Sequence, residues 1–326
     1  MPQMSRPYAV ARVRAQARRP LSNAQLERLV AAPGYAEARA TLTEMGWAVT
    51  PEDDVVRLSV RMTEEACARL RALTPQPGLT DAFLLRHDAQ NLKALVKARM
   101  LGQAPEGLSR CGTMDVEALR HAVADRVYRI LPEPLKAAMN ELEKRLAASD
   151  DARLVDVVID RGLFLLAKQM VAQSGSAAAV RYFTELADLQ NAISWLRLRA
   201  MGRPHAEFMD TLLPGGSVTD AQWKALEGRP ERLAALLPGL GGAVRTALLA
   251  AAADARAIPA LEKAMDDRLL THFRPYRFSP EAPEVLIGDL LAREREAAAV
   301  RLVLTGKLNA FPQETIRERL REAYGG

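Results

Sequence analysis

The sequence contains three copies of one helical pattern, and this repeat constrains the fold more than any other feature. The clearest copies are residues 88–102, DAQNLKALVKARMLG, and residues 188–202, DLQNAISWLRLRAMG, which lie one hundred positions apart. A third, more divergent copy ends at Gly306 and keeps a basic residue, Arg301, five positions before its glycine, but it has Ala292 in place of the aspartate. Such a repeat predicts repeated helical units rather than a single undivided core.

Each copy is predicted to be a long helix that ends at a glycine. Apolar side chains recur at spacings of three and four residues, which is the period of an amphipathic helix. Glycine adopts positive φ without steric cost and commonly ends helices, and a proline shortly afterwards prevents the helix from continuing. The predicted stops are Gly102, Gly202 and Gly306, and the prolines that follow them are Pro105, Pro204 and Pro312.

The beginning of the unit recurs as well. Ser22 and Thr219 are each followed three residues later by glutamine, which is the spacing of a capping box at a helix start. Asp115 is the matching cap in the second copy, where residues 112–114 parallel residues 216–218. The copies span 80, 87 and 87 residues from cap to final glycine, so both ends of the unit define the same repeat.

We therefore expect an all-α protein with three similar helical domains. Their predicted boundaries are residues 1–111 with an extra N-terminal helix, 112–215, and 216–326 with an extra C-terminal helix. The composition agrees, because good helix formers dominate and aromatic residues make up only 5% of the chain. Residues 55–60 alternate enough to form a short strand. The helices expected in addition to the repeated ones cover residues 1–21, 26–45, 135–147, 154–172, 243–270 and 307–326.

No metal, cofactor or catalytic site is predicted. Cys67 and Cys111 have no cysteine or histidine at ligand spacing beside them, so reduced thiols are expected. Residues 305–307 resemble the end of a phosphate-binding loop, but Arg301 replaces its first glycine, and a helix stop is favoured. The glycine-rich residues 239–242 are expected to form a connecting loop. Solvated or core positions are expected for the histidines, which are His87, His121, His205 and His272.

Charge and hydropathy narrow the possible partners. The net charge is +5, but both signs are interspersed along the predicted helix faces, and aromatic side chains that could stack on bases are scattered. A nucleic-acid partner is therefore not expected. The most apolar run, residues 247–253, is far shorter than the roughly 20 residues that cross a bilayer, so no membrane insertion is expected. The arginine-rich N-terminus lacks the apolar stretch of a secretory signal.

The candidate site residues are polar side chains that occur at equivalent positions of two copies. A spacing of three residues places the aspartate and the asparagine on one face of the helix. A buried carboxylate is costly unless it is paired, and the arginines are the expected partners. Because the positions are duplicated, we interpret them as structural residues that hold helices in register. They are Asp88, Asn91 and Arg99 in the first copy and Asp188, Asn191 and Arg199 in the second.

The same residues carry a resemblance to a known family. The pattern DxxNLKxLxxARxxG at residues 88–102 resembles a signature helix of the C subunit of V/A-type rotary ATPases. Residues 294–307 and 316–322 resemble the closing helices of that family, and residues 8–14 and 21–47 resemble its opening. The resemblance extends over the whole chain.

This resemblance implies a funnel of three helical domains around a pseudo-threefold axis, in a family that includes the d subunit of eukaryotic vacuolar ATPases. It implies a non-catalytic rotor subunit without a cofactor, which joins the central shaft of subunits D and F to the membrane proteolipid ring. Such a subunit links ATP turnover to ion translocation and lies in the cytoplasm, at the inner face of the plasma membrane. From the residues alone, two other functions stay open: a helical-repeat adaptor for another cytosolic partner, and a basic nucleic-acid-binding protein.

Overall fold

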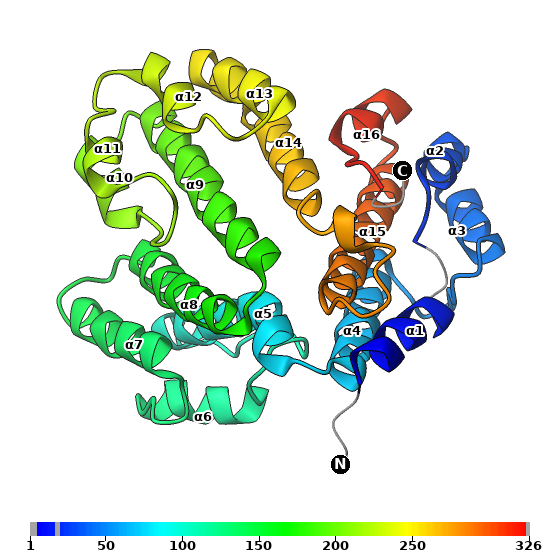
Figure 1. Cartoon of the computed structure of the whole chain (residues 1–326), viewed down its shortest axis with the longest axis horizontal. Helices are drawn as coiled ribbons and strands as arrows, with labels where there is room; N and C mark the ends of the chain where they lie inside the picture. The colour runs from blue at the N-terminus through cyan, green and yellow to red at the C-terminus, as the bar shows by residue number, and fades with distance from the viewer. Residues whose placement is uncertain (1–4, 17–19, 324–326) are drawn as a thin grey trace. The chain divides into compact units, whose positions relative to one another are not determined.

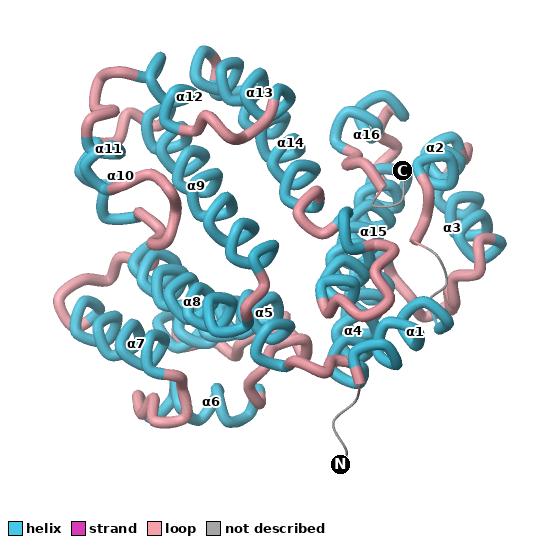
Figure 2. Tube along the Cα trace, in the orientation of Figure 1, coloured by secondary structure: helices cyan, strands magenta, loops and turns pink. Residues whose placement is uncertain are grey.

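The computed structural model describes residues 5–16 and 20–323, in which helices are joined by loops and turns (Figure 1). The described residues contain no strand, which confirms the predicted all-α fold (Figure 2). The predicted terminal helices are present as α1 (Arg6–Gln16) and α16 (Gln313–Arg319). The parts of these predictions that fall on residues 1–4, 17–19 and 324–326 lie outside the described ranges.

The chain divides into two compact units. The first unit combines the segments Met1–Pro75 and Pro259–Gly326, and the second is Gln76–Ile258. The division into three domains and the funnel arrangement stay predictions. The helices of the first unit are α1, α2 (Asn23–Ala31), α3 (Tyr35–Glu44), α4 (Val55–Leu73), α14 (Ile258–Leu270), the 3₁₀ turn η3 (Arg274–Tyr276), α15 (Glu284–Leu308) and α16.

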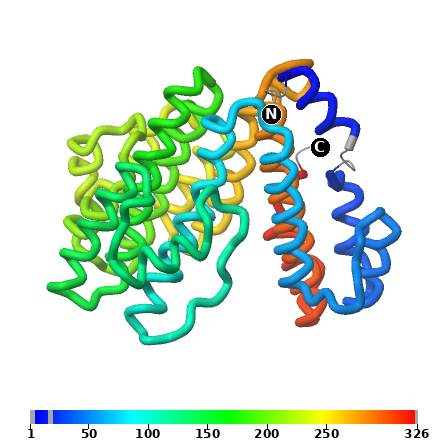
Figure 3. Tube along the Cα trace, turned by 90° about the horizontal axis from the view of Figure 1, so that it is seen from below, coloured from blue at the N-terminus to red at the C-terminus, as the bar shows by residue number. Residues whose placement is uncertain are grey.

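The first unit is held together by a core to which both ends of the chain contribute. Helices α4 and α15 pack along each other although they are far apart in sequence, and Figure 3 shows them side by side. Leu29 and Leu42 from the N-terminal part share this core with Val303 and Ile316 from the C-terminal part. Burying each such side chain contributes roughly 1.5–3 kcal/mol, so the N-terminal helices are stabilised largely by the C-terminal ones.

The predicted strand at residues 55–60 is wrong, because this segment is the first part of α4. Asp54 caps the helix by accepting a hydrogen bond from the backbone N–H of Arg57 at 2.7 Å. The buried residues Val55, Leu58 and Met62 follow the helical period, and this period continues over the next turns to Leu73. The alternation over six residues was too short to outweigh the longer helical pattern.

The second unit is built around α8, which packs against both α5 and α7. Gly162 of α8 permits a close approach to α7, since a Cβ atom at this position would lie 2.5 Å from Ala138 Cβ. The helices of this unit are α5 (Pro77–Leu101), α6 (Val116–Asp125), α7 (Glu133–Leu146), α8 (Arg153–Ser174), α9 (Ala177–Ala200), α10 (His205–Thr211), α11 (Asp220–Lys224), the 3₁₀ turn η1 (Pro230–Arg232), α12 (Leu233–Leu236), α13 (Gly242–Ala253) and the 3₁₀ turn η2 (Ala255–Ala257).

Two predicted helices are interrupted in the structure. Residues 26–45 form α2 and α3, separated around Pro33, which cannot donate a helical hydrogen bond. Residues 243–270 form α13 and α14, separated at Asp254, whose side chain accepts from the N–H of Arg256 at 2.9 Å and so begins a new turn. The helices predicted at residues 135–147 and 154–172 are confirmed as α7 and α8. Of the predicted loop at residues 239–242, residues 239–241 connect α12 to α13, and Gly242 is the first residue of α13.

The predicted glycine stops are confirmed in two copies and wrong in the third. Gly102 follows α5 with φ 64°, and Gly202 follows α9 with φ 66°. Gly306 lies inside α15, which continues to Leu308. A Cβ atom at Gly306 would lie 2.7 Å from the side chain of Ile316 in α16. The absence of a side chain at this glycine therefore allows α15 and α16 to approach closely, and the glycine does not end a helix.

Candidate functional site

The duplicated aspartates anchor the loop that leads into the next copy. Asp88 is fully buried on α5, and its carboxylate accepts hydrogen bonds from the N–H of Thr113 at 2.7 Å, the hydroxyl of Thr113 at 2.8 Å and the N–H of Met114 at 3.0 Å. Gly112 makes room for the carboxylate, since a Cβ atom there would lie 2.1 Å from Asp88 Oδ1. Asp88 thus fixes the chain just before Asp115, the cap of α6.

The second copy repeats this arrangement. The Asp188 carboxylate accepts from the N–H of Ser217 at 2.9 Å, the hydroxyl of Ser217 at 2.6 Å and the N–H of Val218 at 3.2 Å. A Cβ atom at Gly216 would lie 2.1 Å from Asp188 Oδ1, as it would in the first copy. Val218 directly precedes Thr219, which begins α11 with the predicted capping box.

The asparagines hold the same loops at an earlier point. Asn91 donates from its side-chain amide to the carbonyl of Ser109 at 2.8 Å and accepts from the N–H of Ser109 at 2.7 Å. Asn191 makes the same pair of bonds to Leu213, at 3.0 and 2.8 Å. The side-chain amide of each asparagine therefore bonds one loop residue as another peptide group would, by donating to its backbone carbonyl and accepting from its backbone N–H.

In the third copy a different residue on the long helix binds the backbone just before a helix cap. Glu296 of α15 accepts a hydrogen bond from the N–H of Leu21 at 2.9 Å, and Leu21 directly precedes Ser22, the cap of α2. Glu296 lies one helical turn after Ala292, the position aligned with the aspartates. The longer glutamate side chain makes an equivalent bond from there. The repeat pattern did not predict this bond because the aligned position is alanine, and the acceptor lies four residues later on the same side of the helix.

Glu296 belongs to a buried charged group in the first unit. Arg293, which is 4% exposed, lies 3.1 Å from Glu296 and 3.5 Å from Asp289, and Arg69 of α4 lies 3.6 Å from Asp289. Burial raises the pKa of Asp289, and the two arginines oppose this shift. The ion pairs join α15 to α4 at their long mutual contact.

The predicted pairing of the arginines with the aspartates is wrong, because the buried aspartates bind backbone amides. Arg99 pairs with Glu143 of α7 at 2.7 Å and also donates to the carbonyl of Val123 at 2.5 Å. The Tyr128 hydroxyl donates to Glu143 as well, and burial together with this bond raises the pKa of Tyr128. Arg199 donates to the carbonyl of Ala252 at 3.0 Å and lies over the ring of Trp195.

Comparison with known proteins decides the family. Residues 9–319 match the profile of the ATP synthase (C/AC39) subunit family. The chain belongs to this family. A similar protein is the C subunit of the V-type sodium ATPase of Enterococcus hirae, which is 26% identical over 260 residues, a stretch that covers 78% of each chain. The resemblance to the V/A-type C subunit found in the sequence is thereby confirmed.

In this member of the C/AC39 family the segment that resembles a phosphate-binding loop is helical. Thr305, Gly306 and Lys307 lie within α15, where a helix uses its backbone N–H groups for its own hydrogen bonds. Lys307 instead donates to the carbonyl of Ala32 at 2.5 Å. The segment therefore lacks the exposed run of N–H groups that cradles a phosphate.

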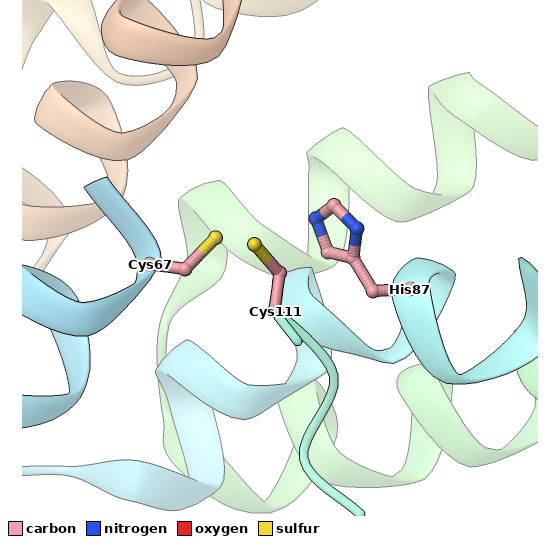
Figure 4. Close-up of side chains that lie close together, drawn as sticks. All are labelled: Cys67, His87 and Cys111. Atoms are coloured by element: carbon pink, nitrogen blue, oxygen red, sulfur yellow. The ribbon is translucent and has the colours of Figure 1, made fainter. Parts of the chain in front are cut away.

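The structure places one cysteine of this C/AC39 protein beside a histidine. In the second unit, Cys111 is buried and its thiol lies within 4.8 Å of a ring nitrogen of His87 (Figure 4). Ser109 connects them, since its hydroxyl accepts from the N–H of Cys111 at 3.2 Å and lies 3.1 Å from His87 Nδ1. Cys67, which is also labelled in Figure 4, is a buried cysteine on α4 of the first unit. The sequence did not predict that Cys111 lies near His87, because the loop that Asn91 anchors brings Cys111 to α5.

Proposed function

We propose that the chain is a non-catalytic subunit of a V/A-type rotary ATPase that joins the central shaft, formed by subunits D and F, to the proteolipid ring. The observation that carries this proposal is the family match, which extends over residues 9–319 of a chain of 326 residues. The relative in Enterococcus hirae is named as the C subunit of a V-type sodium ATPase, which supports a place in the same kind of complex.

The buried anchors suit a subunit that transmits torque. Moving one charge across about 100 mV is worth about 2.3 kcal/mol, so several ions per ATP amount to tens of kcal/mol per turn of the rotor. The buried side chains of Asp88, Asp188 and Glu296 tie loops to long helices with buried or part-buried hydrogen bonds of 2.6 to 3.2 Å. Satisfied buried networks of this kind stiffen a structure, and stiff units pass strain on rather than absorbing it.

The proposed role also places the chain at the cytoplasmic face of the membrane, held there by its partners. None of the helices in the described ranges has the length and apolarity that crossing a bilayer requires. The charged surface of the chain is compatible with reversible docking on polar loops of a membrane ring. The position of Thr305, Gly306 and Lys307 inside α15 supports the view that ATP is bound by other subunits.

Deletion of the chain tests the proposal. Membranes from cells that lack it should retain or release a soluble head that hydrolyses ATP, but ATP addition should drive no ion uptake into vesicles. Uptake should be followed separately with a pH-sensitive dye and with radioactive sodium, which also identifies the coupled ion. Addition of the purified wild-type chain should restore uptake.

Three results would contradict the proposal. One is normal ion uptake per ATP in the absence of the chain. Another is purification of the chain with proteins unrelated to a rotary ATPase, which would favour the adaptor. The last is binding to nucleic acid with an affinity that falls steeply between about 50 and about 200 mM salt, which would favour a nucleic-acid-binding protein.

A further inference from the structure

The end of α9 borders a cavity of about 320 Å³ within the second unit. Its volume is at the lower end of the range for sites that bind small molecules or a few inserted side chains. Apolar and basic residues both contribute to its wall. The lining residues are Trp195, Leu198, Arg199, Gly202, Arg203, Pro204, His205, Phe208, Glu227, Gly228 and Pro230.

Arg199 differs sharply from its counterpart in the first copy. Arg99 is largely buried and pairs with Glu143 near the end of α7. Arg199 reaches the end of α13 in the same way, but α13 has the sequence GAVRTALLAAAA and contains no acidic residue. It offers Arg199 only the carbonyl of Ala252. The described residues provide no carboxylate within ion-pair distance of Arg199, and its guanidinium group is exposed at the cavity.

The guanidinium group is nevertheless held in place. It lies over the ring of Trp195, with 5.7 Å between its central carbon and the ring centroid, and it is fixed on one side by the bond to Ala252. An arginine that is positioned before binding loses less conformational freedom when it forms a bidentate pair with a carboxylate. His205 also lines the cavity, and its buried Nε2 atom has no hydrogen-bond partner in the described structure.

The other charged side chains at the cavity do not compensate the positive charge of Arg199. Arg203 pairs with Glu207 at 2.9 Å, and Glu207 also lies 3.4 Å from Arg153. Glu227 is exposed and forms no described ion pair. The cavity thus presents one ordered, uncompensated cation over an apolar floor, with a single acidic side chain at its edge.

We propose that this cavity receives an aspartate or glutamate side chain from a partner subunit, whose carboxylate pairs with Arg199. The incoming carboxylate takes the place that Glu143 occupies beside Arg99. The accessible apolar part of the cavity wall, which includes Leu198 and Pro204, contacts the methylene groups and neighbouring apolar side chains of the same partner segment. This inference rests on the proposed function, since the partner is a subunit of the rotary complex.

Binding measurements with the full-length chain test the proposal. The chain should be titrated separately against the purified soluble head with its shaft and against the detergent-solubilised proteolipid ring. Arg199→Ala should weaken binding to one of these partners about tenfold, the usual loss when a charged hydrogen-bonded pair is broken. Glu227→Gln should strengthen binding to the same partner about twofold, because it removes a charge that repels the carboxylate.

Two further variants separate this role from a structural one. Arg199→Gln keeps a donor for the Ala252 carbonyl but carries no charge, and it should weaken binding as much as alanine does while the Tm of the free chain stays unchanged. Arg181→Ala removes an exposed arginine from the first turns of the same helix, about 27 Å away at 1.5 Å per residue, and should leave binding unchanged.

A photocrosslinking residue at the exposed position Met201 should then identify the partner segment in the assembled complex. A crosslink to a segment that contains aspartate or glutamate is expected, and reversing that acid to arginine should restore binding by Arg199→Glu. Wild-type affinity of Arg199→Ala for both partners, equal losses for Arg181→Ala, or crosslinks only to a segment without acids would overturn the proposal. If the proposal for Arg199 fails but ion uptake still depends on the wild-type chain, the proposed coupling function remains supported.

Discussion

Glu296 accepts a hydrogen bond from the backbone N–H of Leu21, which lies 275 positions earlier in the chain. Leu21 immediately precedes the helix cap Ser22, just as Val218 precedes the cap Thr219 where Asp188 binds. The long helix of each copy therefore holds the segment before a cap, and the third copy holds the cap segment of the first. One type of contact thus recurs in all three copies, and in the first unit it joins the N-terminal helices to the C-terminal part of the chain.

The anchoring aspartate should contribute substantially to stability. Replacing Asp88 with alanine removes the acceptor for three donors in Thr113 and Met114, whose part-buried hydrogen bonds hold this loop to α5. We expect a loss of about 2–4 kcal/mol and a Tm lower by roughly 5–10 °C. Thermal unfolding followed by circular dichroism measures this change. An unchanged Tm would show that the carboxylate is dispensable.

Gly112 provides a matched test of the same contact. Gly112→Ala places a methyl group where the Asp88 carboxylate lies, so the carboxylate has to move away from the loop. The two substitutions remove one interaction, and their effects should therefore be strongly non-additive. The double variant should be little less stable than Asp88→Ala alone, whereas independent losses that simply add would contradict the shared mechanism.

The repeated pattern predicted the helices and caps well because these depend on residues close together in sequence. Both capping boxes form as expected, with the side chains of Ser22 and Gln25 and of Thr219 and Gln222 bound reciprocally. The parallel between residues 112–114 and 216–218 also proved to be structural, since both loops carry the amides that bind the aspartates.

The long-range partners could not be predicted in the same way. The partner of Arg99 is Glu143, and nothing in the repeat indicates which carboxylate on a neighbouring helix will face it. The role of Gly306 could not be predicted either, because glycine occurs both at helix ends and where two helices pack closely. Only the approach of Ile316 distinguishes the two uses, and that approach is a property of the folded chain.

Gly306→Ala should destabilise the first unit even though alanine favours helices. The new methyl group would lie 2.7 Å from Ile316, and relieving that clash should cost about 1–3 kcal/mol. The measurement is urea unfolding of the full chain. Ile316→Ala supplies the control, because it removes the clashing atoms. In that background Gly306→Ala should be neutral or stabilising, and a further loss there would argue against steric crowding.

Glu296→Ala should loosen the start of α2 selectively. It removes the acceptor for the Leu21 N–H and leaves Arg293 buried with only the more distant Asp289, a change that typically costs about 3–5 kcal/mol. Hydrogen exchange with mass spectrometry should show faster exchange in the peptide that contains Leu21. Glu296→Gln keeps an oxygen acceptor and should show a smaller effect. Equal exchange at Leu21 in all three proteins would refute the anchor.

Asp289 should make stability depend on pH in a defined direction. Burial raises its pKa above the ordinary value of 3.8, although Arg293 and Arg69 oppose the shift. The folded state therefore binds a proton more tightly than the unfolded state, so the stabilisation from this proton is present at low pH and is lost as the pH rises through the folded-state pKa. An asparagine side chain cannot ionise, so Asp289→Asn should lack this dependence.

The comparison of the two proteins isolates this residue from all other titrating groups. The difference in Tm between wild type and Asp289→Asn should fall steadily as the pH is raised from about 4, and it should level off above the folded-state pKa. Arg69→Met removes one of the opposing charges, which lies 3.6 Å from the carboxylate, and should extend the fall to higher pH. If the wild type instead gained stability over Asp289→Asn with rising pH, the arginines and not burial would dominate the environment of this carboxylate.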